Sequence, residues 1–234
     1  MADAIFEDPR LAAVYDAFDG DRADLDAYVA IVEELGARSV LDLGCGTGTF
    51  AVMLADRGLD VVGVDPAAAS LDVARAKGDQ VRWVQGDAST VTERVDLVTM
   101  TANVAQVFVT DEEWALVLAA IRRITTYLVF EVRDPDARAW TGWTREHTNE
   151  RKDLPHVGLV ETWCDLVDVS GELVTFRWTN VFHDDGTTLV SDSTLRFRTQ
   201  ARIEESLRVA GFETLEVRDA PDRPGKELVF VARG

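Results

Sequence analysis

The chain has 234 residues, of which 47% are hydrophobic, and a formal net charge of −18. This length suits one folded core that carries an inserted segment, and the strong negative charge argues against DNA or RNA as a partner because it repels polyanions. No apolar run is long enough for a membrane span, and the first residues do not resemble a signal peptide. Two cysteines do not suggest a disulfide framework. We therefore expect a cytoplasmic protein without a membrane partner.

The first part of the chain is predicted to form two amphipathic helices. Apolar residues recur every three or four positions between Leu11 and Phe18 and again in residues 24–35, and Gly36 is a stop signal for the second helix. Tyr15 lies on the apolar face of the first helix. Both a core position and a ligand contact are open for its side chain.

Residues 39–134 alternate between strand-like and helix-like segments. Helix boundaries are well marked, since Thr110 and Glu113 have the spacing of a capping box and Pro66 suits the first position of a helix. The strand-like segments are SVLDLG, LDVVGVD, VRWVQGD, RVDLVTM and TYLVFEVRD. This alternation predicts an α/β fold with a doubly wound, mostly parallel, Rossmann-like sheet.

The pattern changes after Pro135. Residues 140–156 are polar, irregular and tryptophan-bearing, and three long strands follow, joined by turns at residues 170–171 and 185–186. A helix at residues 200–211 and two further strands complete the chain. We therefore predict one domain made of residues 1–135 and 199–234, with residues 136–198 as an antiparallel β insertion before the last helix.

Residues suited to ligand binding follow the predicted strands. The first strand ends in the glycine turn of residues 44–48, the second at Asp65, the third at Asp87 and the fourth at residues 100–103. In an open α/β sheet, ligands bind beyond these carboxyl ends, and glycine allows both a tight turn and a close backbone approach. A carboxylate after the second strand can accept two ribose hydroxyls, and one after the third can accept an adenine amino group. The pattern favours an adenosine-containing ligand.

The segments VLDLGCGTG, VVGVDPA and VQGDAST resemble the cofactor-binding signature of class I S-adenosylmethionine-dependent methyltransferases. The resemblance covers residues 38–132 and the closing strands, and it implies that the final strand of the sheet is reversed. It places the glycine turn under the methionine part of the cofactor, Asp65 at the ribose, Asp87 with Ala88 at the adenine, and Tyr15 near the cofactor carboxylate. The implied cofactor-binding residues are Tyr15, Gly44, Cys45, Gly46, Gly48, Asp65, Pro66, Asp87, Ala88, Thr101 and Asn103.

Two alternatives share parts of this signature. A nicotinamide-dependent dehydrogenase has the pattern G-x-G-x-x-G/A, but Thr49 occupies its third position here. A non-catalytic cofactor-binding protein of the same fold is the other alternative.

Asp42 is expected to fix the glycine turn through backbone hydrogen bonds, with a ligand contact as the alternative. For Asn103, capping of the next turn and a position facing the methyl group are both open.

The expected reaction is N- or O-methylation of a small organic molecule, with S-adenosylhomocysteine as the product. Residues 100–106 lack the Asn/Asp-Pro-Pro-aromatic run typical of nucleobase methylation. Glu131 and Asp134 supply only one side of a magnesium site, so no metal is expected. His147 and His156 are the candidate catalytic bases, because an imidazole accepts a proton near neutral pH.

The insertion is loosely similar to that of amino-sugar N-methyltransferases. We expect it to cap the methyl acceptor at the carboxyl ends of the parallel strands. A homodimer formed through the insertion is the alternative.

Overall fold

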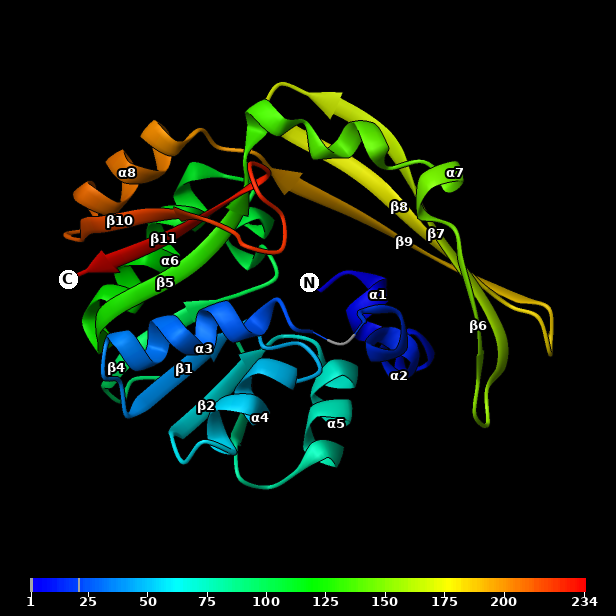
Figure 1. Ribbon diagram of the computed structural model, residues 1–234, viewed down its shortest axis with the longest axis horizontal. Coiled ribbons are helices and arrows are strands. Elements are labelled where there is room, and N and C mark those ends of the chain that lie inside the picture. The colour runs from blue at the N-terminus through cyan, green and yellow to red at the C-terminus, as the bar shows by residue number, and fades with distance from the viewer. Residues whose placement is uncertain (1, 21) are drawn as a thin grey trace.

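The computed structural model describes residues 2–20 and 22–234 and contains two sheets (Figure 1). The larger sheet has seven strands in the order β10-β11-β5-β4-β1-β2-β3. They are β1 (Ser39–Leu43), β2 (Asp60–Asp65), β3 (Arg82–Gln85), β4 (Val95–Met100), β5 (Thr125–Arg133), β10 (Glu213–Asp219) and β11 (Glu227–Arg233). β1 to β5 pair in parallel, whereas β11 runs antiparallel to β5 and β10. The predicted fold class, including the reversed final strand, is confirmed.

Helices cover both faces of this sheet because its central strands are apolar on both sides. The helices are α3 (Leu25–Glu34), α4 (Thr49–Ala55), α5 (Ala68–Lys77), α6 (Asp111–Ile124) and α8 (Gln200–Val209). One core joins β-strand residues to α6 and α8, and the other joins them to α3 and α4. The capping box of Thr110 and Glu113 opens α6 as predicted. Pro66 instead precedes Ala67, the N-cap of α5. Among the described residues, no helix is long and apolar enough to cross a bilayer.

The smaller sheet is antiparallel and has four strands in the order β6-β7-β8-β9. β7 (Gly158–Ser170), β8 (Leu173–Phe182) and β9 (Thr187–Arg196) are the three predicted strands. β6 (Glu150–Leu154) adds a fourth in the segment that we predicted to be irregular. It was missed because its sequence, ERKDL, lacks an apolar alternation, and backbone pairing with β7 at the edge of the sheet holds it.

The remainder of residues 135–149 is built of short helical turns. They are η2 (Pro135–Ala137), η3 (Ala139–Gly142) and α7 (Arg145–Thr148). Trp140 packs edge-on against Phe197, with 4.6 Å between ring centroids, and Trp143 packs at the same distance against Phe176. These tryptophans belong to a small core between the turns and the second sheet.

Two N-terminal helices, α1 (Ala4–Glu7) and α2 (Pro9–Phe18), lie between the two sheets (Figure 1). Leu11 and Val14 of α2 share a core with Val160 and Phe182 of the antiparallel sheet. On the other side, the Ser70 hydroxyl of α5 donates to the Phe6 carbonyl at 2.9 Å. The first helices therefore connect the antiparallel sheet to the larger domain.

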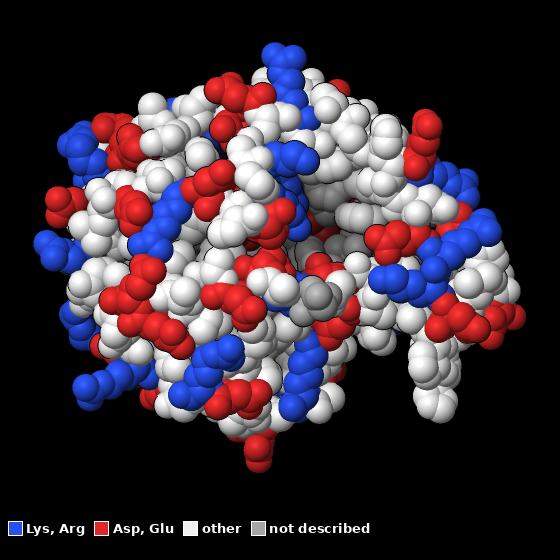
Figure 2. All heavy atoms as spheres, viewed as in Figure 1, with Lys and Arg blue, Asp and Glu red and all other residues white. Residues whose placement is uncertain are grey.

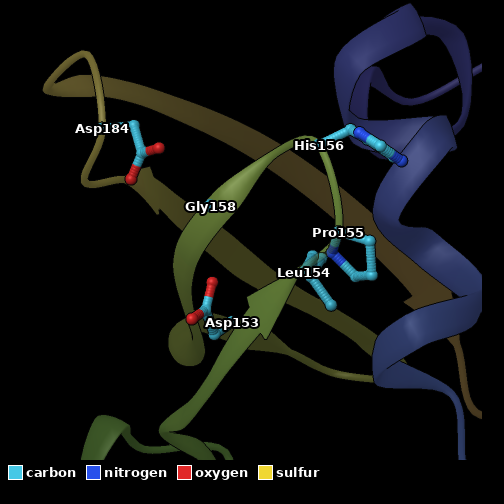
Figure 3. A pocket seen from close by; sticks show the side chains of 6 residues that line it. All are labelled: Asp153, Leu154, Pro155, His156, Gly158 and Asp184. Atoms are coloured by element: carbon cyan, nitrogen blue, oxygen red, sulfur yellow. The ribbon is translucent and has the colours of Figure 1, made fainter.

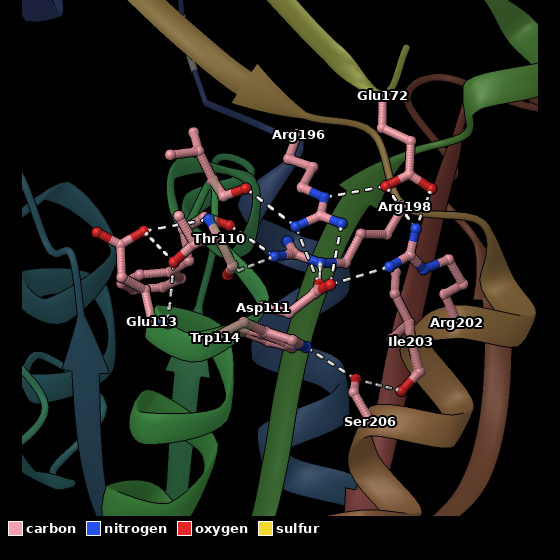
Figure 4. Close-up of polar contacts among 12 residues, drawn as sticks. Thr110, Asp111, Glu113, Trp114, Glu172, Arg196, Arg198, Arg202, Ile203 and Ser206 are labelled. Atoms are coloured by element: carbon pink, nitrogen blue, oxygen red, sulfur yellow. Dashed lines mark hydrogen bonds and ion pairs between the residues drawn. The ribbon is translucent and has the colours of Figure 1, made fainter.

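A network of arginines and acids makes a second connection (Figure 4). Arg196 at the end of β9 and Arg202 in α8 both pair with Glu172 and with Asp111 of α6. Arg198 between them is only 4% exposed, and its guanidinium donates to the carbonyls of Phe108 at 2.8 Å and Thr110 at 2.9 Å. The chain that leaves the insertion is thus fastened to the start of α6.

Arg198 is expected to contribute more to stability than its exposed neighbour Arg202. Arg198→Met leaves two carbonyl groups without their charged donor, and we expect the free energy of unfolding to fall by about 2 kcal/mol or more. Arg202→Met removes the ion pairs of a side chain that is 46% exposed. We therefore expect the free energy of unfolding to fall by less than about 1 kcal/mol. Urea titrations of both variants test this. Equal losses would show that burial does not distinguish the two arginines.

Candidate functional site

The four predicted strand-end segments meet at one edge of the larger sheet, because β1 to β4 are parallel. The glycine turn follows β1, Asp65 ends β2, Asp87 follows β3, and residues 101–103 follow β4. The surface is hollowed between the part that holds the parallel sheet and the part that holds the antiparallel sheet (Figure 2). Both acidic and basic side chains border this hollow, and acidic ones lie along its lower edge, which suits a ligand with positive charge there (Figure 2).

The glycine turn combines tight packing with one open position. Gly44, Gly46 and Gly48 have φ values of +74°, +54° and +82°, in the left-handed region that favours glycine. An added Cβ would lie 2.6 Å from the Val104 side chain at Gly44 and 2.4 Å from that of Trp83 at Gly48, whereas nothing lies within 4 Å at Gly46. The first and last glycines are therefore required by packing inside the protein, and the bare backbone for a ligand is at Gly46.

Asp65 ties this turn to the end of β2. Its Oδ2 accepts the Gly46 N–H at 2.8 Å, and its Oδ1 accepts the Ala67 N–H at 2.8 Å. The side chain is buried, and burial raises the pKa of the carboxyl while the two N–H donors oppose that shift. Each carboxylate oxygen retains acceptor capacity beyond these bonds. Asp65 thus holds the turn and can still accept ligand hydroxyls.

Asp42 was expected to hold the turn, and this expectation is wrong. Asp42 is buried in β1, where its Oδ1 accepts the Thr99 hydroxyl at 3.0 Å. Its Oδ2 has no hydrogen-bond partner in residues 2–20 and 22–234. Burial raises the pKa of this carboxyl to about 7.

Cys45 in the glycine turn and Asp87 after β3 each make few contacts. Cys45 donates its backbone N–H to the Val64 carbonyl at 3.1 Å, and burial raises the pKa of its thiol. Asp87 is exposed, and its Oδ1 accepts the Ser89 N–H at 2.8 Å and the Ser89 hydroxyl at 2.6 Å. These bonds lower the pKa of Asp87, so it remains ionised next to the buried Ala88.

The chain after β4 turns sharply. After the buried Thr101, Ala102 and Asn103 both have left-handed backbones, with φ values of +53° and +63°. Asn103 makes no side-chain cap to η1 (Val104–Val107). Its Nδ2 donates to Glu227 Oε1 at 3.2 Å, its backbone N–H donates to Glu131 Oε1 at 3.2 Å, and its buried Oδ1 has no partner within the described ranges. Two consecutive strained residues at a ligand-binding edge are a feature of functional turns.

These bonds place Asn103 against a buried acidic pair that sequence analysis did not identify as a unit. Glu131 of β5 and Glu227 of β11 are 6% and 3% exposed. The Tyr28 hydroxyl donates to Glu131, and burial together with the Glu227 charge raises the pKa of Glu131 to about 7. Glu227 pairs with Arg223 at 2.7 Å. The one local signal was a glutamate inside the apolar strand sequence YLVFEVR.

Tyr15 lies on α2 near two cations. Its ring centroid is 5.6 Å from that of Phe6. Burial and the charge of Asp19 raise the pKa of its hydroxyl, while the charges of Arg22 and Arg133 lower it. Arg22 also lowers the pKa of Asp42 in β1. The predicted contact between Tyr15 and the cofactor carboxylate stays a prediction.

The two candidate bases lie on separate parts of the insertion. His147 is exposed on α7, where its Nδ1 is 3.0 Å from the Thr144 hydroxyl. His156 lies at the β6–β7 turn and lines an open hollow there with Asp153 and Asp184 (Figure 3). No hydrogen bond or ion pair in the described part of the chain joins either histidine to the glycine turn or to Asp65. Their catalytic role stays a prediction.

Comparisons with known proteins agree with this geometry. Residues 40–126 match the family of methyltransferase domains. The cypemycin N-terminal methyltransferase of a Streptomyces species is 39% identical over 105 residues, which cover 43% of this chain and 43% of that protein. The chain therefore matches less than half the length of this curated relative.

Solved structures match over nearly the whole chain. The CcbJ methyltransferase from Streptomyces caelestis has a TM-score of 0.78 at 23% identity and covers 98% of both chains. CalS10, an amino pentose methyltransferase from Micromonospora echinaspora with bound S-adenosylmethionine, has a TM-score of 0.71 at 21% identity and covers 94% of this chain and 97% of that one. At these identities, the likeness establishes a shared fold.

The buried Asp42 predicts a pH dependence of stability. Its folded-state pKa of about 7 lies above the ordinary value near 4, so the folded protein holds this proton more tightly. Stability from this group is therefore present at low pH and is lost as pH rises through about 7. Asp42→Asn keeps a neutral group of the same shape and should flatten the fall in unfolding free energy between about pH 5 and 7. Urea titrations across this range measure it, and parallel pH profiles would contradict it.

Proposed function

We propose that the chain, whose residues 40–126 match a methyltransferase domain, is a class I S-adenosylmethionine-dependent methyltransferase that methylates an amine nitrogen of a small organic molecule. The observation that carries the proposal is the open backbone at Gly46 joined to the buried Asp65 carboxylate. Together they provide a close approach for a ligand and an acceptor for its hydroxyls at the expected edge of the sheet.

The residues present fit this cofactor. Asp65 would accept the ribose hydroxyls with the lone pairs that Gly46 and Ala67 leave free, and Asp87 with Ala88 would border the adenine. When bound, S-adenosylmethionine supplies an electrophilic methyl group with a good leaving group already attached. The protein then has to orient the acceptor and exclude water, and orientation alone can supply up to about 7 to 11 kcal/mol.

A nitrogen acceptor is supported by two observations. The acidic side chains along the lower edge of the hollow and the net charge of −18 favour the approach of a cationic amine. The similar proteins include one named for an N-terminal methyl transfer and one named for an amino pentose. The antiparallel sheet with α1 and α2 borders the hollow and would cap the acceptor, whereas dimerisation through this sheet stays a prediction.

Asp65 provides the test of cofactor binding, and Asp60 at the opposite end of β2 is its matched control. Asp65→Asn weakens the charge-assisted bonds to the ribose, so we expect S-adenosylhomocysteine to bind at least about tenfold more weakly. Asp60→Asn should change the affinity by less than about twofold, because the exposed Asp60 lies far along the strand from the turn. Calorimetry at a temperature where both variants are folded measures this. Binding of NADH without S-adenosylhomocysteine would refute the cofactor assignment.

The acceptor class can be tested with compounds that differ only in the reacting atom. We expect the purified chain to form S-adenosylhomocysteine with amino sugars and not with the sugars that carry hydroxyl groups at the same positions. Mass spectrometry should find the added methyl group on nitrogen. Turnover of the hydroxyl compounds alone would replace the nitrogen acceptor with oxygen and leave the cofactor site unaffected.

A further inference from the structure

Arg133 is the last residue of β5, and its guanidinium has few hydrogen-bond or ion-pair partners among the described residues. Its backbone N–H donates to Gln106 Oε1 at 3.2 Å, which fixes the residue at the carboxyl edge of the sheet. Within residues 2–20 and 22–234, the guanidinium makes no hydrogen bond, and its single ion-pair contact is Nε to Glu227 Oε1 at 3.8 Å. The side chain is only 22% exposed. A covered guanidinium with five free N–H donors is costly unless a partner is supplied.

The neighbouring acid does not supply that partner. Glu227 Oε1 already accepts from Arg223 at 2.7 Å and from Asn103 at 3.2 Å. By comparison, the covered Arg196 and Arg198 use their guanidinium groups in several bonds each. Burial lowers the pKa of Arg133 in spite of the acids around it. Its environment is therefore short of negative charge at hydrogen-bond distance.

An aromatic ring of the insertion lies beside Arg133. Trp143 of the insertion presents its ring 5.6 Å from the Arg133 guanidinium carbon. A guanidinium beside an aromatic ring is suited to bind a planar carboxylate.

We propose that Arg133 binds a carboxylate group of the methyl acceptor; this rests on the proposed function. The cofactor also has a carboxylate, but the position of Arg133 favours the acceptor. β4 separates β5 from β1 and its glycine turn, and Arg133 contacts the insertion through Trp143. The acceptor is therefore an amine that also carries a carboxylate.

Benzoate and benzamide probe this site, because they share a shape and differ in charge. With the protein saturated by S-adenosylhomocysteine, we expect ligand-detected NMR titrations to show benzoate binding at least about fivefold more tightly than benzamide. Arg133→Met should abolish this difference, and Arg133→Lys should retain part of it. Arg138→Met is the control, since it removes the same charge from an exposed arginine five positions along the chain and should leave the difference unchanged.

A second measurement separates the two possible carboxylates. S-adenosylhomocysteine has the methionine-derived carboxylate, and 5′-methylthioadenosine lacks it. We expect Arg133→Met to bind both within about twofold of the unmodified chain, which also reports that the variant is folded. A selective loss of S-adenosylhomocysteine affinity would assign Arg133 to the cofactor and overturn the proposal. An unchanged preference for benzoate in Arg133→Met would overturn it as well. Failure of the unmodified chain to bind S-adenosylhomocysteine would instead refute the proposed function.

Discussion

The two hydrogen bonds that Asp65 accepts determine the shape of the site. They join Gly46, in the turn after β1, to Ala67, in front of α5, through one buried carboxylate. Because β1 and β2 are adjacent parallel strands, the two turns leave the sheet at the same edge, and the carboxylate fixes their separation. The open backbone of Gly46 is held beside the remaining lone pairs of Asp65 before any ligand arrives. Preorganisation of this kind lowers the entropic cost of binding.

The opposite side of the site depends on the acidic pair beneath Asn103. Glu131 and Glu227 accept from both the backbone and the side chain of Asn103, so they hold the left-handed turn after β4. Tyr28 of α3 donates a hydrogen bond to Glu131, and Arg223 in the loop before β11 donates one to Glu227. A buried pair of acids is stable only with such donors. The reversed strand β11 is therefore part of the site, since it brings Glu227 to this position.

The local parts of the site could be predicted from the sequence, and the long-range parts could not. The glycine turn and Asp65 follow strands whose apolar runs are plain in the sequence, so their shared edge follows from the parallel arrangement. Asn103 and Glu227 are 124 positions apart, and their contact depends on the pairing of β11 with β5. β6 has no apolar alternation because only its backbone is paired. The lack of a close ion-pair partner for Arg133 could not be predicted, because it depends on Glu227 binding Arg223 and Asn103 instead.

A crystal structure of the chain with S-adenosylhomocysteine would show whether Asp65 and Gly46 form the cofactor site. We expect the ribose hydroxyls to lie within hydrogen-bond distance of the Asp65 carboxylate and the ligand to pass over Gly46 without displacing Val104 or Trp83. The Asp65 bonds to Gly46 and Ala67 should remain, since the turn is held before binding. Ligand density at another edge of the sheet, or an Asp65 that contacts only its two backbone donors, would show that this carboxylate does not bind the cofactor.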